Sequence, residues 1–489
     1  MTPTGFIRRP SALFRYLRAC CCDSPLLGLG TAIWVLSMAL WWPEGLSFAD
    51  EVGYLGETKL LLAGHLLPRL SDPGMWASTP HGLVPQYPLL LSALLVPFLA
   101  VTPRAVFVLG VLSGIGLCWL AARILKGWGT NPAWALLVLM HPTVALMVRT
   151  TTADVLLAAL ALGSWLALTG NRRVVTAFAF AGMFAIKATG MLLGACLVGG
   201  EILSMITTPR LSSAETKSRL VTCAVALAAG FLSIFVANEI SARQLWFAYD
   251  LSYLGTPPFW FSYLGRTAPA HLRTVLFLPP LLIAGAFPYW RRRAWGPLFV
   301  ILGYGTLMCS YFFVDRGTSR LESLVLSPRL LLPVVVFLLV GYADLLAAGL
   351  RRFPLSDRVV GPLLIAGAAS GAVAVGIAHR RWQAPMGMAR RAAEQIVRRV
   401  GSNELGLAPQ AVKAGLLFPG PTPVASIGNS EAAVVLCSDH SASYRAPDDG
   451  GNYNCSAPGY HSEYRSGGFE ILVRTPSSAP GPRPTDPKR

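Results

Sequence analysis

Charged residues are scarce in this sequence. Asp, Glu, Lys and Arg make up only 13% of its 489 residues, with 24 acidic against 41 basic side chains. Soluble globular proteins carry about 25% charged residues, so the composition excludes an ordinary soluble domain. Hydrophobic residues make up 53% of the chain. Runs of about 20 apolar residues, long enough to span a bilayer, recur from Leu26 to Ala378. The sequence therefore predicts a helical, polytopic integral membrane protein.

Several catalytic signatures are also missing. The sequence has no P-loop, no dinucleotide-binding glycine motif after a strand, no His-Glu-x-x-His and no Cys-x-x-Cys pair. Nucleotide hydrolysis and zinc catalysis are therefore unsupported. The nine cysteines lack metal-ligand spacing. Cys437 and Cys455 are the only two in the polar C-terminal part, where they can pair if that part lies outside the cytoplasm.

The net charge of +17 comes from short arginine-rich clusters between apolar runs. This pattern is typical of cytoplasmic loops rather than of nucleic-acid binding. The candidate membrane spans are 26–43, 87–101, 104–123, 132–149, 153–169, 174–186, 188–206, 220–239, 272–290, 295–314, 329–349 and 358–378. The run 87–101 is short and contains two prolines, and all five later clusters face the cytoplasm only if it does not cross. We therefore expect about eleven crossings, a cytoplasmic N-terminus and an external C-terminus, in a bacterial inner or plasma membrane. Twelve crossings with an internal C-terminus is the alternative.

These boundaries predict four parts. They are a basic cytoplasmic segment 1–25, a membrane domain 26–378 with an external loop 44–103, an external domain 379–474, and a disordered Pro- and Ser-rich tail 475–489. The predicted fold class is all-α and polytopic, with about eleven transmembrane helices and juxtamembrane helices in the first external loop. The external C-terminal domain is expected to be small, and α/β or irregular.

The first external loop carries two adjacent carboxylates, Asp50 and Glu51, directly after the first span. An ordinary solvated acidic loop is the simplest interpretation. The same loop also carries His65 and Tyr87, and long loops without a fold of their own are often functional. We therefore interpret the carboxylate pair as a catalytic site.

Three later segments place charge at the predicted outer boundary. Asp154 opens an apolar run, where a helix cap is the alternative role. Lys187 interrupts an apolar stretch. Placing a lysine at the centre of a membrane span costs about 2.5–3.5 kcal/mol, so we expect Lys187 to lie in an outer turn and to face an anion. A snorkelling side chain is the alternative. Arg320 and Arg329 belong to a charged loop suited to bidentate phosphate binding, or simply to exposed ion pairs.

Five short motifs occur in a familiar order between about residues 25 and 380. They are Phe48-Ala49-Asp50-Glu51, Gln86-Tyr87-Pro88, His141-Pro142 through Asp154, Ile186-Lys187-Ala188-Thr189-Gly190, and Ser327-Pro328-Arg329. In this the sequence resembles the GT-C type of polytopic membrane glycosyltransferases. That group includes the protein O-mannosyltransferases and the aminoarabinose–lipid A transferases.

The resemblance implies cell-envelope glycosylation, in which a sugar passes with inversion from a polyprenyl-phosphate donor to a lipid, glycan or protein hydroxyl at the outer membrane face. It also implies that Asp50 is the base. We expect Glu51 to orient the acceptor or tune that base, and substrate to be bound by Asp154, Lys187, Tyr87, His65, Arg320 and Arg329. No cofactor is expected with certainty; a divalent cation stays open, because two adjacent carboxylates alone do not define its site. A transporter or flippase for a lipid-linked substrate is the alternative, although such proteins often contain repeated halves and this sequence shows none.

Overall fold

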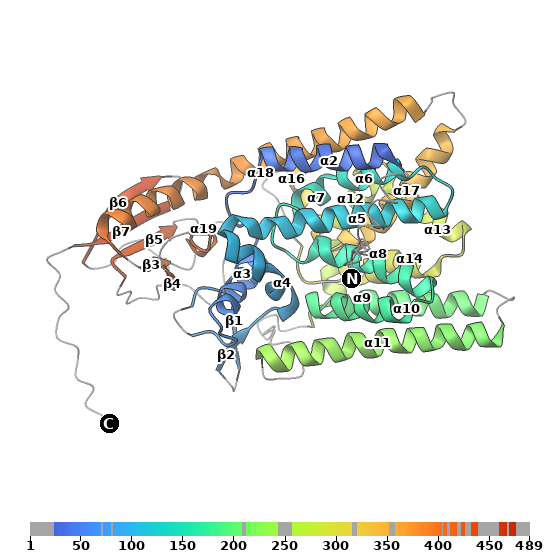
Figure 1. The fold of residues 1–489 in the computed structure, drawn as a ribbon, viewed down its shortest axis with the longest axis horizontal. Helices are drawn as coiled ribbons and strands as arrows, with labels where there is room; N and C mark the ends of the chain where they lie inside the picture. The colour runs from blue at the N-terminus through green and yellow to red at the C-terminus, as the bar shows by residue number, and fades with distance from the viewer. Residues whose placement is uncertain are drawn as a thin grey trace, which may run out of the picture.

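The computed structural model describes residues 24–69, 72–79, 82–207, 212–242, 257–314, 320–351, 357–402, 404–407, 411–417, 422–425, 432–438, 459–466 and 469–475. Long helices run side by side in a bundle, and a small sheet lies beyond one end of it (Figure 1). Residues 1–23 of the predicted segment 1–25, residues 476–489 of the predicted tail 475–489, and Cys455 lie outside the described residues.

The helices follow one another through the bundle and into the C-terminal part. They are α2 (Pro25–Leu40), α3 (Ala49–Leu62), α4 (Leu89–Val101), α5 (Val108–Gly127), α6 (Leu136–Met140), α7 (Pro142–Met147), α8 (Asp154–Thr169), α9 (Arg173–Ile186), α10 (Gly190–Thr207), α11 (Ser213–Ala242), α12 (Leu264–Phe277), α13 (Phe287–Arg291), α14 (Trp295–Phe299), α15 (Gly305–Cys309), α16 (Arg320–Leu326), α17 (Leu332–Leu350), α18 (Asp357–Val400) and α19 (Val412–Gly415). The predominantly helical fold class is confirmed.

Five helices in the described ranges are long and apolar enough to cross a bilayer. They are Pro103–Gly127, Gly190–Thr207, Ser213–Ser241, Leu332–Leu350 and Val359–Val400, with hydropathies from 1.7 to 2.4. Shorter apolar helices, including α2, α8 and α9, pack among them. The protein is thus an integral membrane protein, as predicted.

Three predicted spans are not continuous helices. The segment 132–149 breaks at His141 into α6 and α7, because Pro142 has no backbone N–H to continue the first helix and is well suited to begin the next. The segment 272–290 is divided among α12, a 3-10 turn and α13, and 295–314 passes through a π-helical turn at Val300–Tyr304. Apolar composition alone does not distinguish a broken helix from a straight one.

The loop 44–103, predicted to be external, packs as a small unit at one end of the bundle. Helix α4 has 13 residues, about 20 Å of helix, which is shorter than the roughly 30 Å hydrocarbon core. It packs on α3, where Ser92 Oγ donates to the Tyr54 carbonyl at 3.1 Å. This agrees with the expected juxtamembrane helix. A hairpin of β1 (Trp76–Thr79) and β2 (Gly82–Pro85) completes the loop and was not predicted.

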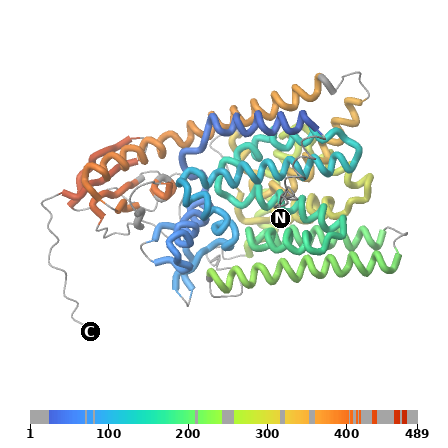
Figure 2. The backbone as a smooth tube through the Cα atoms, in the orientation of Figure 1, coloured from blue at the N-terminus to red at the C-terminus, as the bar shows by residue number. Residues whose placement is uncertain are grey.

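The basic clusters gather at the opposite end of the bundle from α3 (Figures 1 and 2). They lie at the end of α5, the start of α9, the start of α11, the end of α13 and the end of α17. The described members are Arg123, Lys126, Arg172, Arg173, Lys217, Arg219, Arg291, Arg292, Arg293 and Arg351. This one-ended distribution is what the predicted topology requires, while which end faces the cytoplasm stays a prediction.

The C-terminal part is built on α18, a helix of 44 residues. Its first half packs on α2 and α6, and its second half carries the sheet. The predicted boundary at 378/379 therefore falls inside a continuous helix. Glu44 contacts α18 on both sides of Pro385, with Oε1 3.1 Å from Arg380 Nη2 and Oε2 3.6 Å from Arg391 Nη1.

The C-terminal sheet has the strand order β4-β3-β5-β7-β6. Its strands are β3 (Glu404–Leu407), β4 (Thr422–Ala425), β5 (Val434–Ser438), β6 (Tyr460–Ser466) and β7 (Phe469–Arg474). Strand β3 is parallel to β4 and β5, and β7 is antiparallel to β5 and β6. The buried residues Phe469, Ile471 and Val473 alternate along β7, so one face of this small sheet joins the hydrophobic core.

Glycine is required where α17 crosses the 3-10 turn 282–286. A Cβ on Gly341 would lie 1.9 Å from the Gly285 carbonyl oxygen, whereas one on Gly349 of the same helix would meet no atom within 4 Å. We expect Gly341→Ala to lower the free energy of unfolding by at least about 2 kcal/mol, because backbone must move to admit the methyl. Thermal unfolding in detergent would show this, with Gly349→Ala as the control. Equal melting temperatures for the two variants would contradict it.

A second prediction concerns Glu57, which is buried between α3 and α4 and hydrogen-bonded to Ser92 Oγ at 2.6 Å. Burial raises the pKa of Glu57 to about 8. Between about pH 5 and 8 only the unfolded state releases this proton, so rising pH removes about 1.4 kcal/mol of stability per pH unit. We expect Glu57→Gln to abolish this slope when melting temperature is measured against pH. The exposed Glu404→Gln should keep it, and an unchanged slope in Glu57→Gln would be inconsistent with a protonated carboxyl.

Candidate active site

Glu51 joins the start of α3 to a loop one hundred residues later in the chain. Its Oε2 accepts the backbone N–H groups of Ser47 at 2.5 Å and Phe48 at 2.8 Å, which precede the helix. Its Oε1 accepts the backbone N–H of Thr151 at 2.7 Å and the hydroxyl of the same residue at 3.2 Å. A carboxylate in the first turn also interacts favourably with the positive end of the helix dipole.

These contacts occupy all the hydrogen-bond acceptor positions of the Glu51 carboxylate. The side chain is fully buried, and four donors occupy its four lone-pair positions. Burial raises the pKa of Glu51, while the backbone N–H donors of Thr151, Phe48 and Ser47 oppose that rise. The arrangement fixes α3 against the 149–153 loop and leaves the neighbouring Asp50 to face the interior of the site.

Asp50 is the partly accessible carboxylate of the group, with its side chain 19% exposed. Tyr87 donates its hydroxyl to Asp50 Oδ1 at 3.0 Å, and Arg329 Nη2 lies 3.3 Å from Oδ2. Burial by itself raises the pKa of Asp50, but the positive charges of Arg329 and Lys187 and the Tyr87 hydrogen bond outweigh it. The net pKa shift is downward, so Asp50 is ionised at neutral pH.

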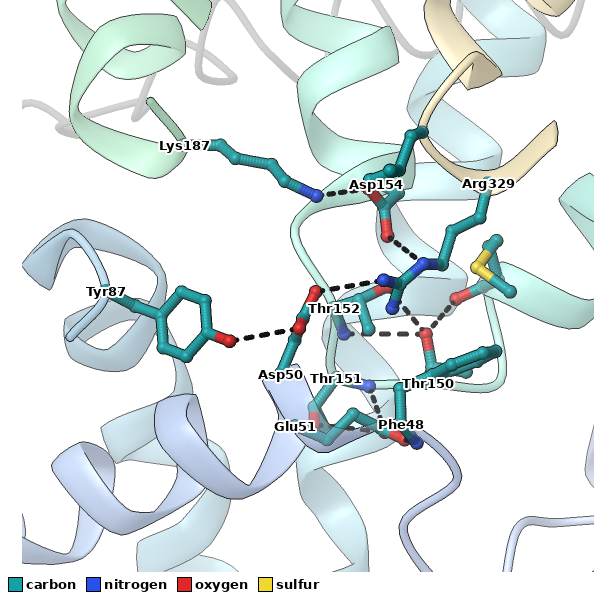
Figure 3. Close-up of polar contacts among 12 residues, drawn as sticks. Phe48, Asp50, Glu51, Tyr87, Thr150, Thr151, Thr152, Asp154, Lys187 and Arg329 are labelled. Atoms are coloured by element: carbon teal, nitrogen blue, oxygen red, sulfur yellow. Dashed lines mark hydrogen bonds and ion pairs between the residues drawn. The ribbon is translucent and has the colours of Figure 1, made fainter. Parts of the chain in front are cut away.

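Asp154 and Lys187 form a buried ion pair beside Asp50 (Figure 3). Lys187 Nζ lies 2.6 Å from Asp154 Oδ1, and Arg329 Nε lies 4.0 Å from Asp154 Oδ2. Asp154 begins α8, and Lys187 lies in the turn between α9 and α10, as the sequence predicted for both. The guanidinium of Arg329 also lies over the Phe48 ring, 4.6 Å from its centroid, a favourable cation–π geometry.

The four charges balance one another. Two carboxylates, Asp50 and Asp154, face two cations, Lys187 and Arg329, and the four side chains are between 3% and 19% exposed. Buried charges are tolerated when each is paired. Two cations side by side are suited to receiving an anion such as a phosphate. In the described part of the chain no three His, Cys, Asp or Glu side chains converge as a metal site.

Two predicted binding residues lie apart from this group. His65 is exposed in the turn after α3, and Arg320 is exposed at the start of α16. Within the described ranges neither makes a side-chain hydrogen bond or ion pair with the charged group, so their binding roles stay predictions. Asp315 and Arg316 of the predicted charged loop lie outside the described residues.

A second buried network was not predicted from the sequence. Arg149 Nε donates to His379 Nδ1 at 3.4 Å, and His379 Nε2 lies 2.6 Å from Ser47 Oγ. Gln383, one turn along α18, bonds the Gly45 carbonyl at 2.5 Å. One sign of this network was present in the sequence, which is the position of Arg149 at the end of an apolar run. A charged residue at membrane depth is usually functional and paired. The network ties α18 to the segment that enters α3.

No family model and no curated protein sequence matches this chain. Among solved structures, ArnT from Cupriavidus metallidurans bound to undecaprenyl phosphate aligns with a TM-score of 0.62 and 12% identity over 97% of this chain and 100% of that one. The apo state of the same enzyme gives 0.56 and 13% over 95% and 98%.

A third structure, the arabinosyltransferase EmbB from Mycobacterium smegmatis, gives a TM-score of only 0.39 at 14% identity over 78% of this chain and 42% of that one, too low to bear on the fold. The ArnT alignments extend over nearly the whole length of both chains. At this identity they establish the architecture and not the substrates. The chain has the fold of ArnT, in agreement with the resemblance that the order of its motifs indicated.

Proposed function

We propose that the protein transfers a sugar from a polyprenyl-phosphate donor to an acceptor hydroxyl at the outer face of the membrane. The main support is the charged group of the candidate site. In it the ionised, partly exposed carboxylate of Asp50 lies beside the cations of Lys187 and Arg329, with Asp154 between them. Support comes from the fold, since an ArnT structure contains undecaprenyl phosphate. The membrane domain 26–378 would carry the chemistry, with the C-terminal sheet on the outer side.

In this proposal Asp50 is the general base. The acceptor oxygen attacks the anomeric carbon, the bond from that carbon to the phosphate oxygen breaks, and the acceptor proton passes to Asp50. Its lowered pKa makes it a weak base, so proton transfer comes late, after bond formation has made the hydroxyl acidic. Tyr87 and Arg329 hold the carboxylate in place, and Glu51 positions the helix that carries it.

The departing polyprenyl phosphate needs positive charge to stabilise it. Lys187 and Arg329 are the two cations of the group, and both now contact carboxylates. We assign Asp154 the role of holding Lys187 at the turn until the phosphate arrives and becomes its partner. Direct displacement from the face opposite the phosphate inverts the anomeric centre. The acceptor is a lipid, glycan or protein hydroxyl.

The test of the base is Asp50→Asn. The amide keeps the shape of the side chain and can accept the Tyr87 hydrogen bond, but it cannot take a proton. We expect transfer to fall by about 100- to 10,000-fold while the protein still expresses and remains folded in detergent, with transfer measured from a radiolabelled polyprenyl-phosphate sugar in proteoliposomes. Asp72→Asn, in the same external loop, is the control. Full transfer activity of Asp50→Asn would remove Asp50 from the mechanism, whereas an absence of transfer by the wild-type protein would favour the transporter alternative.

A fourth prediction separates phosphate binding from proton transfer. Lys187→Gln should raise the donor KM and lower kcat, whereas Lys187→Arg should retain most activity because it keeps the charge. Combining Lys187→Gln with Asp154→Asn should cost much less than the sum of the two single losses, because the residues act as a pair. Strictly additive losses in the steady-state parameters would show that Asp154 does not act through Lys187.

A further inference from the structure

An open cleft lies at the end of the bundle opposite the active-site group. It has a volume of about 510 Å³ and is lined by Asn171, Arg172, Arg173, Val174, Val175 and Ser218. Its two walls are the turn between α8 and α9 and the first turns of α11. The proposed sugar transfer makes no use of these residues.

Asn171 fixes the two walls of the cleft relative to each other, and its conformation is part of the turn between α8 and α9. Asn171 has φ of 50°, a left-handed conformation that asparagine tolerates better than most residues. From there its amide donates to Ser218 Oγ at 2.7 Å and accepts from Thr222 Oγ1 at 2.5 Å. The turn is thereby fixed to α11 on two successive helical turns, so the shape of the cleft exists before any ligand arrives.

The donors at the cleft are matched to an oxyanion. Arg172 and Arg173 are exposed, and neither forms an ion pair in the part of the chain that the structure describes, whereas nearby Arg219 is neutralised by Glu201 at 2.9 Å. Ser218 Oγ accepts from Asn171 and, at 3.1 Å, from Arg173 Nη2. Both of its acceptor positions are therefore used, and its own O–H is the group with which it can donate to a ligand.

The apolar rim of the cleft identifies the rest of the ligand. Val174 and Val175 line the cleft and are 69% and 53% exposed, and Phe178, one turn further along α9, is 76% exposed. On α11, Leu220 and Val221 are 46% and 45% exposed. Two apolar helix faces thus lead away from an arginine pair toward the middle of the bundle, a layout that fits acyl chains below a charged headgroup.

We propose that this cleft binds the phosphate of an anionic phospholipid from the leaflet at the basic end of the bundle. Arg172, Arg173 and Ser218 bind the headgroup oxygens, and the exposed faces of α9 and α11 contact the acyl chains. The binding site is independent of the proposed transferase chemistry, which lies at the other end of the same helices.

The experiment measures lipid binding to the full-length protein in detergent by native mass spectrometry. We expect dioleoylphosphatidylglycerol to bind more tightly than dioleoylphosphatidylcholine. In Arg172→Gln/Arg173→Gln its Kd should rise by about 10-fold or more. The matched control is Arg123→Gln/Lys126→Gln, which removes the same charge from the same end of the bundle but outside this cleft, and should change Kd by less than about twofold.

Several outcomes would overturn the proposal. An equal loss in the control pair would show a diffuse charge effect, and equal binding of the two lipids would show no headgroup recognition. Displacement of the glycerophospholipid by millimolar inorganic phosphate would indicate a site for the free ion. If the double arginine variant does not fold, Ser218→Ala supplies the test, since it keeps both arginine charges and the Asn171–Thr222 hydrogen bond that fixes the turn to α11. An unchanged Kd in that variant would also overturn the proposal.

Discussion

The carboxylate of Glu51 is the contact on which the geometry of the candidate site depends. It accepts from the chain entering α3 with one oxygen and from the 149–153 loop with the other. Loss of either set would leave buried N–H groups unpaired, at a cost of about 1–3 kcal/mol each. Because Asp50 lies in the first turn of α3 and Asp154 directly follows the loop, this single side chain sets the distance between two acids that the sequence separates widely.

The interactions within the charged group also depend on the low polarity of its surroundings. Asp50, Asp154, Lys187 and Arg329 are largely buried, and charges interact more strongly there than in water. A group that is neutral overall can remain in such a place at modest cost. An incoming phosphate changes that balance, and the cations can then exchange a carboxylate partner for the ligand.

Much of this arrangement was predictable because charge is rare in the sequence. Asp154, Lys187 and Arg329 are conspicuous beside apolar runs, and the expense of burying them implies that they meet partners. Contacts made by backbone or by aromatic rings gave no such signal, so Thr151 and the Phe48 ring were not predicted. Hydropathy also predicts apolar runs but not their breaks, which is why the divisions near Pro142 and Val300 appeared only in the structure. His65 and Arg320 were selected by residue type alone, and type does not determine where a loop folds.

The ion pairs between Glu44 and α18 help to determine how the C-terminal sheet is oriented. Proline within a helix removes one backbone hydrogen bond and favours a bend, so α18 is weakest near Pro385. Glu44 forms ion pairs with Arg380 on one side of Pro385 and with Arg391 on the other, so its carboxylate bridges the proline. Contacts on both sides of the proline let the segment leading into α3 set the angle at which the C-terminal sheet projects from the bundle.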